Sequence, residues 1–184
     1  AKSNLITPKA YLANEELMAY DKMARRPLIH VIYEKYAAKC MRAGAMDFDD
    51  LLLQMFRLLY QNPDQVLDKY QMQFKYLMVD EFQDTNYLQY EILKLLTVYP
   101  GSKNNICIVG DDAQSIYAFR GANINNILSF EKDYPDLKVI KLEQNYRSFG
   151  NILDAANALI SHNVRRLGKN LRTDAGAGEP VRVL

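Results

Sequence analysis

The chain has 184 residues, 49% of them apolar and 24% charged, with a formal net charge of +1. This composition is ordinary for a soluble globular protein. No apolar run approaches the roughly 18 to 20 residues of a membrane span, and the first residues lack a signal-peptide pattern, so we expect a cytoplasmic protein with no membrane partner. Cys40 and Cys107 lack metal-ligand spacing, which predicts reduced core thiols.

The charge is unevenly distributed along the chain. Residues 1–43 hold 8 basic and 4 acidic side chains, residues 44–137 hold 7 and 14, and residues 138–184 hold 8 and 4. An acidic centre repels DNA phosphate unless its carboxylates bind a metal ion or point away from the strand. The simplest interpretation for most of these residues is a solvated surface.

The sequence pattern of the first part of the chain, up to about Tyr70, predicts helices. Apolar residues recur every four positions after Pro27, which predicts an amphipathic helix that Gly44 ends. Asp47 is then placed to cap a second helix, with Asp50 completing a capping-box-like pair. This structural role explains the acidic cluster at 47–50 without catalysis. A further helical stretch ends near Tyr70.

Beyond Tyr70 the helical spacing of apolar residues gives way to short unbroken apolar runs at 76–79, 106–109 and 137–140. These runs predict strands buried on both faces. Helical patterns around 86–97 and 123–131 separate them. Strand and helix alternation of this kind is typical of a parallel α/β sheet. The carboxyl ends of such strands gather functional groups, and this sequence places its most polar residues there.

An acidic pair, Asp80 and Glu81, directly follows the first predicted strand. Nucleotide hydrolysis needs one carboxylate to hold Mg²⁺ and one to orient the attacking water, which makes Asp80 the metal candidate and Glu81 the base. Gln83 is then a candidate sensor of the γ-phosphate. The competing interpretation is that acids at a strand end cap the next helix, and we assign Asp84 or Thr85 to that role.

The second predicted strand runs into a loop with interleaved aromatic and basic residues, Tyr117, Phe119 and Arg120. Aromatic rings beside a guanidinium form a stacking platform for unpaired bases. Taken singly, either ring is more often part of a core. The third strand leads to Arg147, where an arginine can stabilise a transferring phosphate or pair with Glu143 instead.

Three blocks, at 79–86, 109–122 and 142–148, resemble motifs II, III and IV of superfamily 1A helicases of the UvrD, Rep and PcrA type, in the same order and spacing. The stretch 46–52 is similar to the segment where that family's chain returns to subdomain 1A. The resemblance implies a partial RecA-like P-loop NTPase core with parallel strands and flanking helices, plus a helical portion of subdomain 1B. Residues 1–42 would end 1B, 43–141 would form the second half of 1A, and 142–184 would start 2A.

The resemblance also implies roles for individual residues. Asp80 would coordinate Mg²⁺ and Glu81 would activate water, in agreement with the interpretation above. Gln114 would contact the γ-phosphate of ATP, Tyr146 would stack on the nucleotide base, and Arg147 would be the arginine finger. The same comparison puts the aromatic and basic residues of the second loop along single-stranded DNA. Two departures are that a phenylalanine at 119 replaces the family's frequent tryptophan and that an alanine, not an acid, precedes Gln114.

The P-loop pattern G-x-x-x-x-G-K-[ST] is absent: the one Gly-Lys pair, Gly168-Lys169, has Asn163 where the first glycine belongs and Asn170 after the lysine. We therefore expect an internal piece of a longer helicase that is inactive alone. The resemblance implies that the parent uses ATP and Mg²⁺ to move 3′ to 5′ on single-stranded DNA and to unwind duplex DNA. The alternatives are a helicase subunit of a helicase-nuclease and a decayed helicase-like DNA-binding scaffold. The uninterrupted motif III run favours the simple helicase over the first, and the intact site residues argue against the second.

Overall fold

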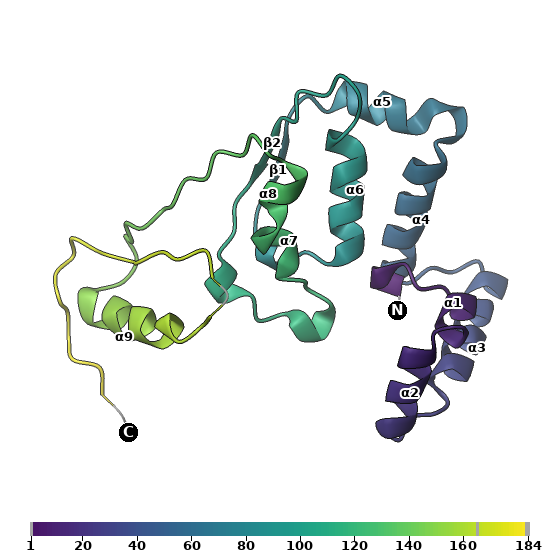
Figure 1. Ribbon diagram of the computed structural model, residues 1–184, viewed down its shortest axis with the longest axis horizontal. Helices are drawn as coiled ribbons and strands as arrows, with labels where there is room; N and C mark the ends of the chain where they lie inside the picture. Colours follow the sequence, from purple (N-terminus) through teal and green to yellow (C-terminus); the bar gives the residue numbers. More distant parts are fainter. Residues whose placement is uncertain (1, 165, 183–184) are drawn as a thin grey trace.

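A computed structural model describes residues 2–164 and 166–182 of the chain. Figure 1 shows three groups of elements: a helical N-terminal group, a central group around a small sheet, and a C-terminal group around one helix. The elements are η1 (Lys2–Asn4), α1 (Pro8–Leu12), α2 (Glu15–Met23), α3 (Ile29–Arg42), α4 (Phe48–Gln61), η2 (Pro63–Gln65), α5 (Val66–Gln73), β1 (Leu77–Val79), η3 (Phe82–Asp84), α6 (Tyr87–Thr97), β2 (Ile106–Ile108), η4 (Asp112–Gln114), η5 (Ala118–Arg120), α7 (Asn125–Leu128), α8 (Phe130–Asp133) and α9 (Gly150–Ser161).

The N-terminal helices follow their local signals. Thr7 and Asn14 cap α1 and α2 by accepting a hydrogen bond from the backbone three residues on. Helix α3 ends at Arg42 and is followed by Gly44 with φ +60°, which confirms the predicted glycine stop. Its apolar stripe lies largely in solvent, since Leu28 and Ile32 are 62% and 64% exposed.

Helix α4 begins with the predicted capping box. The Asp47 side chain accepts from the Asp50 backbone N–H, and the Asp50 side chain accepts from the Asp47 N–H. Buried Lys2 forms ion pairs with both carboxylates, at 2.7 and 2.8 Å. Tyr36 on α3 donates its hydroxyl to Asp47 at 2.9 Å. This charged cluster therefore joins η1, α3 and α4, and its role in the structure agrees with the structural interpretation of the 47–50 acids.

Strands β1 and β2 pair in parallel, with Leu77 opposite Ile106 and Val79 opposite Ile108. Helix α6 links them, so strand, helix and strand form the predicted α/β unit. The chain is thus a mixed helix and strand protein with a small parallel sheet, compatible with an α/β domain of the P-loop type.

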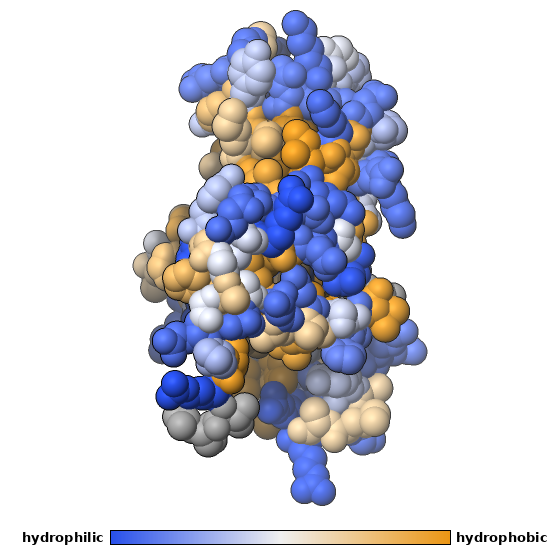
Figure 2. Space-filling view, turned by 90° about the vertical axis from the view of Figure 1, so that its left-hand side faces the viewer, coloured by the Kyte–Doolittle hydropathy of each residue, from blue (hydrophilic) through white to orange (hydrophobic). Residues whose placement is uncertain are grey.

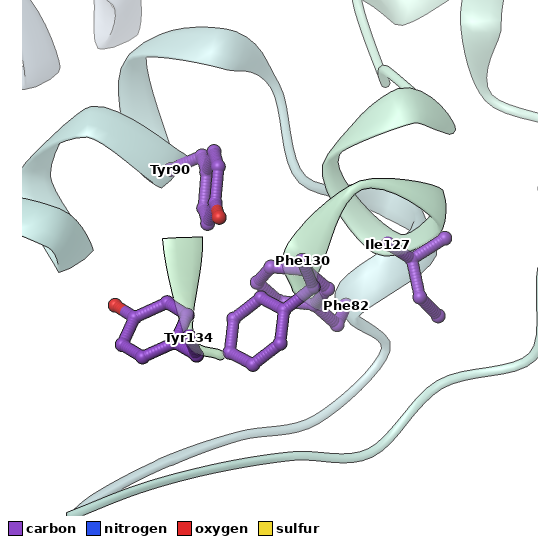
Figure 3. Close-up of a cluster of buried hydrophobic side chains, with 5 residues drawn as sticks. All are labelled: Phe82, Tyr90, Ile127, Phe130 and Tyr134. Atoms are coloured by element: carbon purple, nitrogen blue, oxygen red, sulfur yellow. The ribbon is translucent and has the colours of Figure 1, made fainter. Parts of the chain in front are cut away.

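One face of this sheet is covered by an aromatic cluster, drawn in Figure 3. Phe82 and Phe130 are 0% and 1% exposed, and their rings meet edge to face at 5.4 Å between centroids. Tyr134 stacks on Phe130 at 4.4 Å. Inward-facing strand residues pack against the cluster. The members of the cluster are Phe82, Tyr90, Ile127, Phe130 and Tyr134. It fixes the segments that follow β1 and β2.

The prediction that the strands are buried on both faces is wrong. Met78, the central residue of β1, is 81% exposed, and its partner Cys107 on β2 is exposed as well. Cys107 is therefore not a core thiol. Cys107 and the half-buried Cys40 are both free cysteines.

In Figure 2, which views the side that carries α9, apolar surface lies in patches between polar side chains. An apolar run predicts a strand but does not say how many of its faces are covered.

The third predicted strand is also wrong: residues 137–140 form no strand in the part of the chain that the structure describes. A strand needs a hydrogen-bonded neighbour, and a cavity of about 410 Å³ separates residues 138–142 from 107–110. Val139 and Ile140 are consequently 61% and 69% exposed, while Leu137 packs against the aromatic cluster. The predicted helix at 123–131 is divided into α7 and α8.

The cap of α6 differs from the prediction too. Asn86, not Asp84 or Thr85, is the cap residue, and it forms a capping box with Gln89. The Thr85 hydroxyl instead donates to the Phe82 carbonyl at 2.7 Å. The backbone turns once as η3 before α6 begins, so the cap lies one residue later than expected.

Candidate nucleotide and nucleic-acid site

The carboxyl ends of β1 and β2 meet at one edge, and the parallel pairing continues beyond both strands. The Val109 N–H donates to the Val79 carbonyl at 2.8 Å, and the Phe82 N–H donates back to the Val109 carbonyl at 3.0 Å. The residues that follow β1 are thereby held against those that follow β2. This backbone pairing creates the site, because it brings together two loops that are about 30 positions apart in the sequence.

Asp80 and Glu81 directly follow β1, as predicted, and both are exposed. The Glu81 N–H donates to Oδ1 of Asp80 at 2.9 Å. Glu81 adopts a left-handed backbone, with φ +49° and ψ +41°, which is unfavourable for a residue with a side chain. Such strain persists only where the surroundings impose it, and it concentrates at functional sites.

Gln83 connects this turn to the second loop. Its side chain is almost completely buried, with 1% exposed, and both of its ends are used. Nε2 donates to Oε2 of Glu81 at 2.7 Å, and Oε1 accepts from the Asp111 N–H at 3.0 Å. The Ser115 hydroxyl donates to the Gln83 carbonyl at 3.3 Å. A buried amide with both ends satisfied is a rigid connector, because exchanging either partner would leave a polar group unpaired.

Gly110 makes this connection possible by its size. A Cβ atom at position 110 would lie 2.8 Å from Oε1 of Gln83 and 3.1 Å from Cδ1 of Ile127. Any side chain would therefore collide with the connector. Here the glycine is needed for the space it leaves, since its φ lies outside the left-handed region.

Asp111 extends the network to Gln114. The Gln114 side chain donates from Nε2 to Oδ2 of Asp111 at 2.9 Å, and the Ala113 N–H donates to Oδ1 at 3.0 Å. Burial by itself would raise the pKa of Asp111, but the hydrogen bonds from Lys169 and Gln114 lower it below its usual value. One chain of hydrogen bonds thus runs from Glu81 through Gln83 and Asp111 to Gln114.

Our sequence reasoning did not select Asp111 as a site residue. The signal was present, because Asp111 and Asp112 follow β2 as Asp80 and Glu81 follow β1. We also missed Lys169, whose ammonium lies 2.6 Å from Oδ2 of Asp111. No local pattern identifies that lysine, since it is 58 positions away in the sequence.

The aromatic loop after η4 is on the surface. Phe119 is 79% exposed and Tyr117 is 39% exposed, with ring centroids 5.9 Å apart. The Arg120 guanidinium carbon lies 5.5 Å from the centroid of each ring. The core interpretation of these rings therefore fails, and the three side chains form one exposed aromatic and cationic cluster. Gly121, with φ +92°, ends the loop in a left-handed conformation.

Tyr146 and Arg147 lie beyond the central group. Asn145 accepts backbone hydrogen bonds from Arg147 and Ser148 through its side chain, and its own N–H donates to the Arg172 carbonyl at 2.7 Å. Tyr146 is 90% exposed. Across residues 2–164 and 166–182, no hydrogen bond or ion pair joins the side chain of Tyr146 or Arg147 to Asp80, Glu81 or Gln114. Glu143, the alternative partner of Arg147, instead accepts from the Asn170 N–H.

Comparison with known proteins gives a consistent family assignment. The model of the UvrD/REP helicase N-terminal domain matches residues 1–135. The chain belongs to this helicase family. It is 46% identical over 181 residues to the ATP-dependent DNA helicase PcrA of Leuconostoc citreum, covering 98% of this chain and 23% of that protein. It is 49% identical over 150 residues to DNA helicase II of Haemophilus influenzae and to that of Escherichia coli, covering 82% of this chain and 20% of each. The chain therefore spans about a fifth to a quarter of the length of these relatives.

The Asp80 carboxylate of this UvrD/REP family chain is an exposed oxygen donor of the kind that Mg²⁺ binds. No three His, Cys, Asp or Glu side chains are grouped closely enough to hold a metal within the described ranges. Protein-bound Mg²⁺ takes one or two carboxylates and completes its shell with phosphate and water oxygens. The exposed Asp80 carboxylate fits that pattern.

None of the described helices is long and apolar enough to cross a bilayer.

Proposed function

We propose that this chain is part of an ATP-dependent DNA helicase that moves 3′ to 5′ along single-stranded DNA and separates duplex DNA. The hydrogen-bond chain from Glu81 to Gln114, beside an exposed aromatic and cationic loop, is the observation that carries the proposal. The family assignment supports it, since several relatives bear the name of ATP-dependent DNA helicases.

We propose further that residues 1–42 end subdomain 1B, that 43–141 form the second half of a RecA-like subdomain 1A, and that 142–184 begin subdomain 2A. The absence of a P-loop pattern from the sequence and the small share of each relative that the chain covers support this view. In this arrangement the phosphate-binding loop belongs to another part of the parent protein.

In the proposed mechanism Asp80 holds Mg²⁺ and Glu81 orients and deprotonates the attacking water. The metal, when bound, neutralises charge that develops on the phosphate oxygens. Gln83 fixes the carboxylate of Glu81 by donating to one of its oxygens, while Glu81 remains exposed. Gln114 contacts the γ-phosphate of ATP, Tyr146 stacks on the base of the bound nucleotide, and Arg147 provides the arginine finger.

The link to DNA passes through the second loop. Gln114 precedes Tyr117, Phe119 and Arg120 by three to six positions, so a displacement of Gln114 changes the position of the loop that stacks on unpaired bases. Closing around ATP and reopening after hydrolysis would shift this grip along the strand.

The test is the Glu81→Gln variant of the full-length parent. Because a positioned general base contributes about 10²- to 10⁴-fold to a rate, we expect a loss of DNA-stimulated ATP turnover of that order, with single-strand affinity retained. Glu131→Gln on the exposed surface of α8 is the matched control and should leave turnover unchanged. Turnover in Glu81→Gln close to wild type would refute the assignment of the base, and turnover by the 184 residues alone would refute the missing-loop argument.

A further inference from the structure

The segment 166–170 is tied to the loop that follows β2. Lys169 pairs with Oδ2 of Asp111 at 2.6 Å, and the Leu167 N–H donates to Oδ2 of Asp112 at 2.9 Å. Lys141 donates to the Gly168 carbonyl at 2.6 Å. A cavity of about 310 Å³ lies next to these contacts, between the loop and α9. The segment therefore reaches the candidate site from a distant part of the chain.

Two donors share one oxygen of Asp111. Lys169 Nζ lies 2.6 Å from Oδ2, and Gln114 Nε2 lies 2.9 Å from the same atom. The ion pair is largely shielded from solvent, since the side chains are 25% and 16% exposed for Lys169 and Asp111. A shielded charge is screened weakly, so the ammonium strongly affects how well this oxygen accepts from a second donor.

We propose that Lys169 is a positioning residue that sets, through Asp111, how firmly the Gln114 side chain is held away from the nucleotide. This inference depends on the proposed function, in which Gln114 contacts the γ-phosphate. With Lys169 in place, the oxygen is shared and Gln114 exchanges readily between Asp111 and a phosphate. Without Lys169, the whole negative charge of Asp111 acts on Gln114, and binding a triphosphate must first break a stronger hydrogen bond.

A merely structural tether gives a different expectation. If segment 166–170 only anchors one part of the molecule to another, any lost contact on that segment has the same effect. Lys141 offers the matched control, because it holds the Gly168 carbonyl on the same segment and, within residues 2–164 and 166–182, forms no hydrogen bond or ion pair with Asp111. A positioning role requires the charge at position 169 specifically, so an arginine there should restore function and a glutamine should not.

The experiment compares nucleotide affinities in the full-length parent protein. The probes are an ATP analogue with a β,γ-imido bridge and ADP, which lacks the γ-phosphate that Gln114 would contact. Because one hydrogen bond is at stake, Lys169→Gln should weaken analogue binding about 2- to 10-fold and leave ADP binding unchanged. Lys169→Arg should restore the wild-type ratio, and Lys141→Gln should not alter it. In an Asp111→Asn background, Lys169→Gln should have no further effect.

Three outcomes overturn the inference: equal losses for both nucleotides, the same ratio change in Lys141→Gln, or an unchanged ratio in Lys169→Gln. Gln114→Ala distinguishes this failure from that of the proposed function. If Gln114→Ala alters the ratio and Lys169→Gln does not, only the positioning role fails; if Gln114→Ala leaves the ratio unchanged, the proposed γ-phosphate contact fails. Thermal unfolding checks every variant, and Lys169→Met replaces Lys169→Gln if the latter does not fold.

Discussion

The Gly110→Ala substitution tests whether the buried connector is as tightly packed as the structure indicates. The added Cβ would lie 2.8 Å from Oε1 of Gln83, 3.1 Å from Cδ1 of Ile127 and 3.3 Å from the Phe82 nitrogen. Carbon contacts are most favourable near 3.5 to 4.0 Å, so the neighbours must move apart by about half an ångström or more. The backbone atom cannot move without disturbing its bond to the Val109 carbonyl.

The expected destabilisation has two parts. Overpacking a filled site by one methyl group costs about 1 to 3 kcal/mol. Displacing Gln83, which is 1% exposed, also breaks its hydrogen bond from the Asp111 N–H and leaves a buried polar group unpaired, which adds about 1 to 3 kcal/mol. We therefore expect the free energy of unfolding to fall by about 2 to 6 kcal/mol, a large effect for a single methyl group.

The assay is urea unfolding of wild type, Gly110→Ala, Gln83→Ala and the double variant. Because the nearest atom to the new Cβ belongs to Gln83, truncating Gln83 removes the main collision. The double variant should then be more stable than the sum of the single effects implies, by about 1 kcal/mol or more. Effects that add to within about 0.5 kcal/mol would refute the argument, since residues without contact behave in that way.

Three further predictions address other parts of the chain. Burial alone would raise the pKa of Asp47, but bonds from Lys2, Asp50 and Tyr36 lower it to about 2. Its contribution to stability is therefore complete above about pH 5 and is lost as the pH falls through about 2 toward 1. Over that interval the urea midpoint of Asp47→Asn, which keeps a capping side chain, should fall less than that of wild type. Phe119→Ala in the parent should weaken single-strand binding about 5- to 150-fold, as expected for one lost stacking contact. The unfolding midpoint should stay unchanged, because Phe119 is 79% exposed. Tyr20→Ala on α2 is the control, since Tyr20 is 69% exposed, and it should leave the affinity for single-stranded DNA unchanged. Phe130→Ala should lower the free energy of unfolding by about 3 to 5 kcal/mol, because the ring is 1% exposed at the centre of the aromatic cluster; a loss below about 1 kcal/mol would mean that the cluster is loosely packed.

Local signals predicted the elements that depend on local chemistry. The capping box of Asp47 and Asp50 and the stop at Gly44 involve residues within a few positions of one another, and both were correct. The strand of residues 137–140 was wrong because a strand depends on a partner that the sequence does not specify. The same limit explains why the exposure of Met78 and Cys107 was not foreseen.

At the candidate site, the residue types that follow β1 identified Glu81 and Gln83, whereas Gln114 was selected through the resemblance to the helicase family. The structure brings these three residues into one chain of hydrogen bonds. Asp111, which joins them, was missed because its bond to Gln83 depends on the pairing of β1 with β2, which residue types do not specify. Lys169 was missed for a different reason: its partner is fixed by the path of the chain, which no spacing rule describes.

The division of the site into exposed ends and a buried centre has a physical consequence. Glu81 and Gln114 are exposed, as groups that meet a ligand must be, whereas Gln83 between them is 1% exposed. An exposed side chain exchanges its partner for water at little cost, but a buried amide that loses a partner costs about 1 to 3 kcal/mol. A displacement of Glu81 or Gln114 therefore costs less free energy if the other end moves with it than if a hydrogen bond of Gln83 is broken. If Glu81 and Gln114 act on the nucleotide as proposed, this asymmetry couples the water-activating carboxylate to the loop that carries Tyr117 and Phe119.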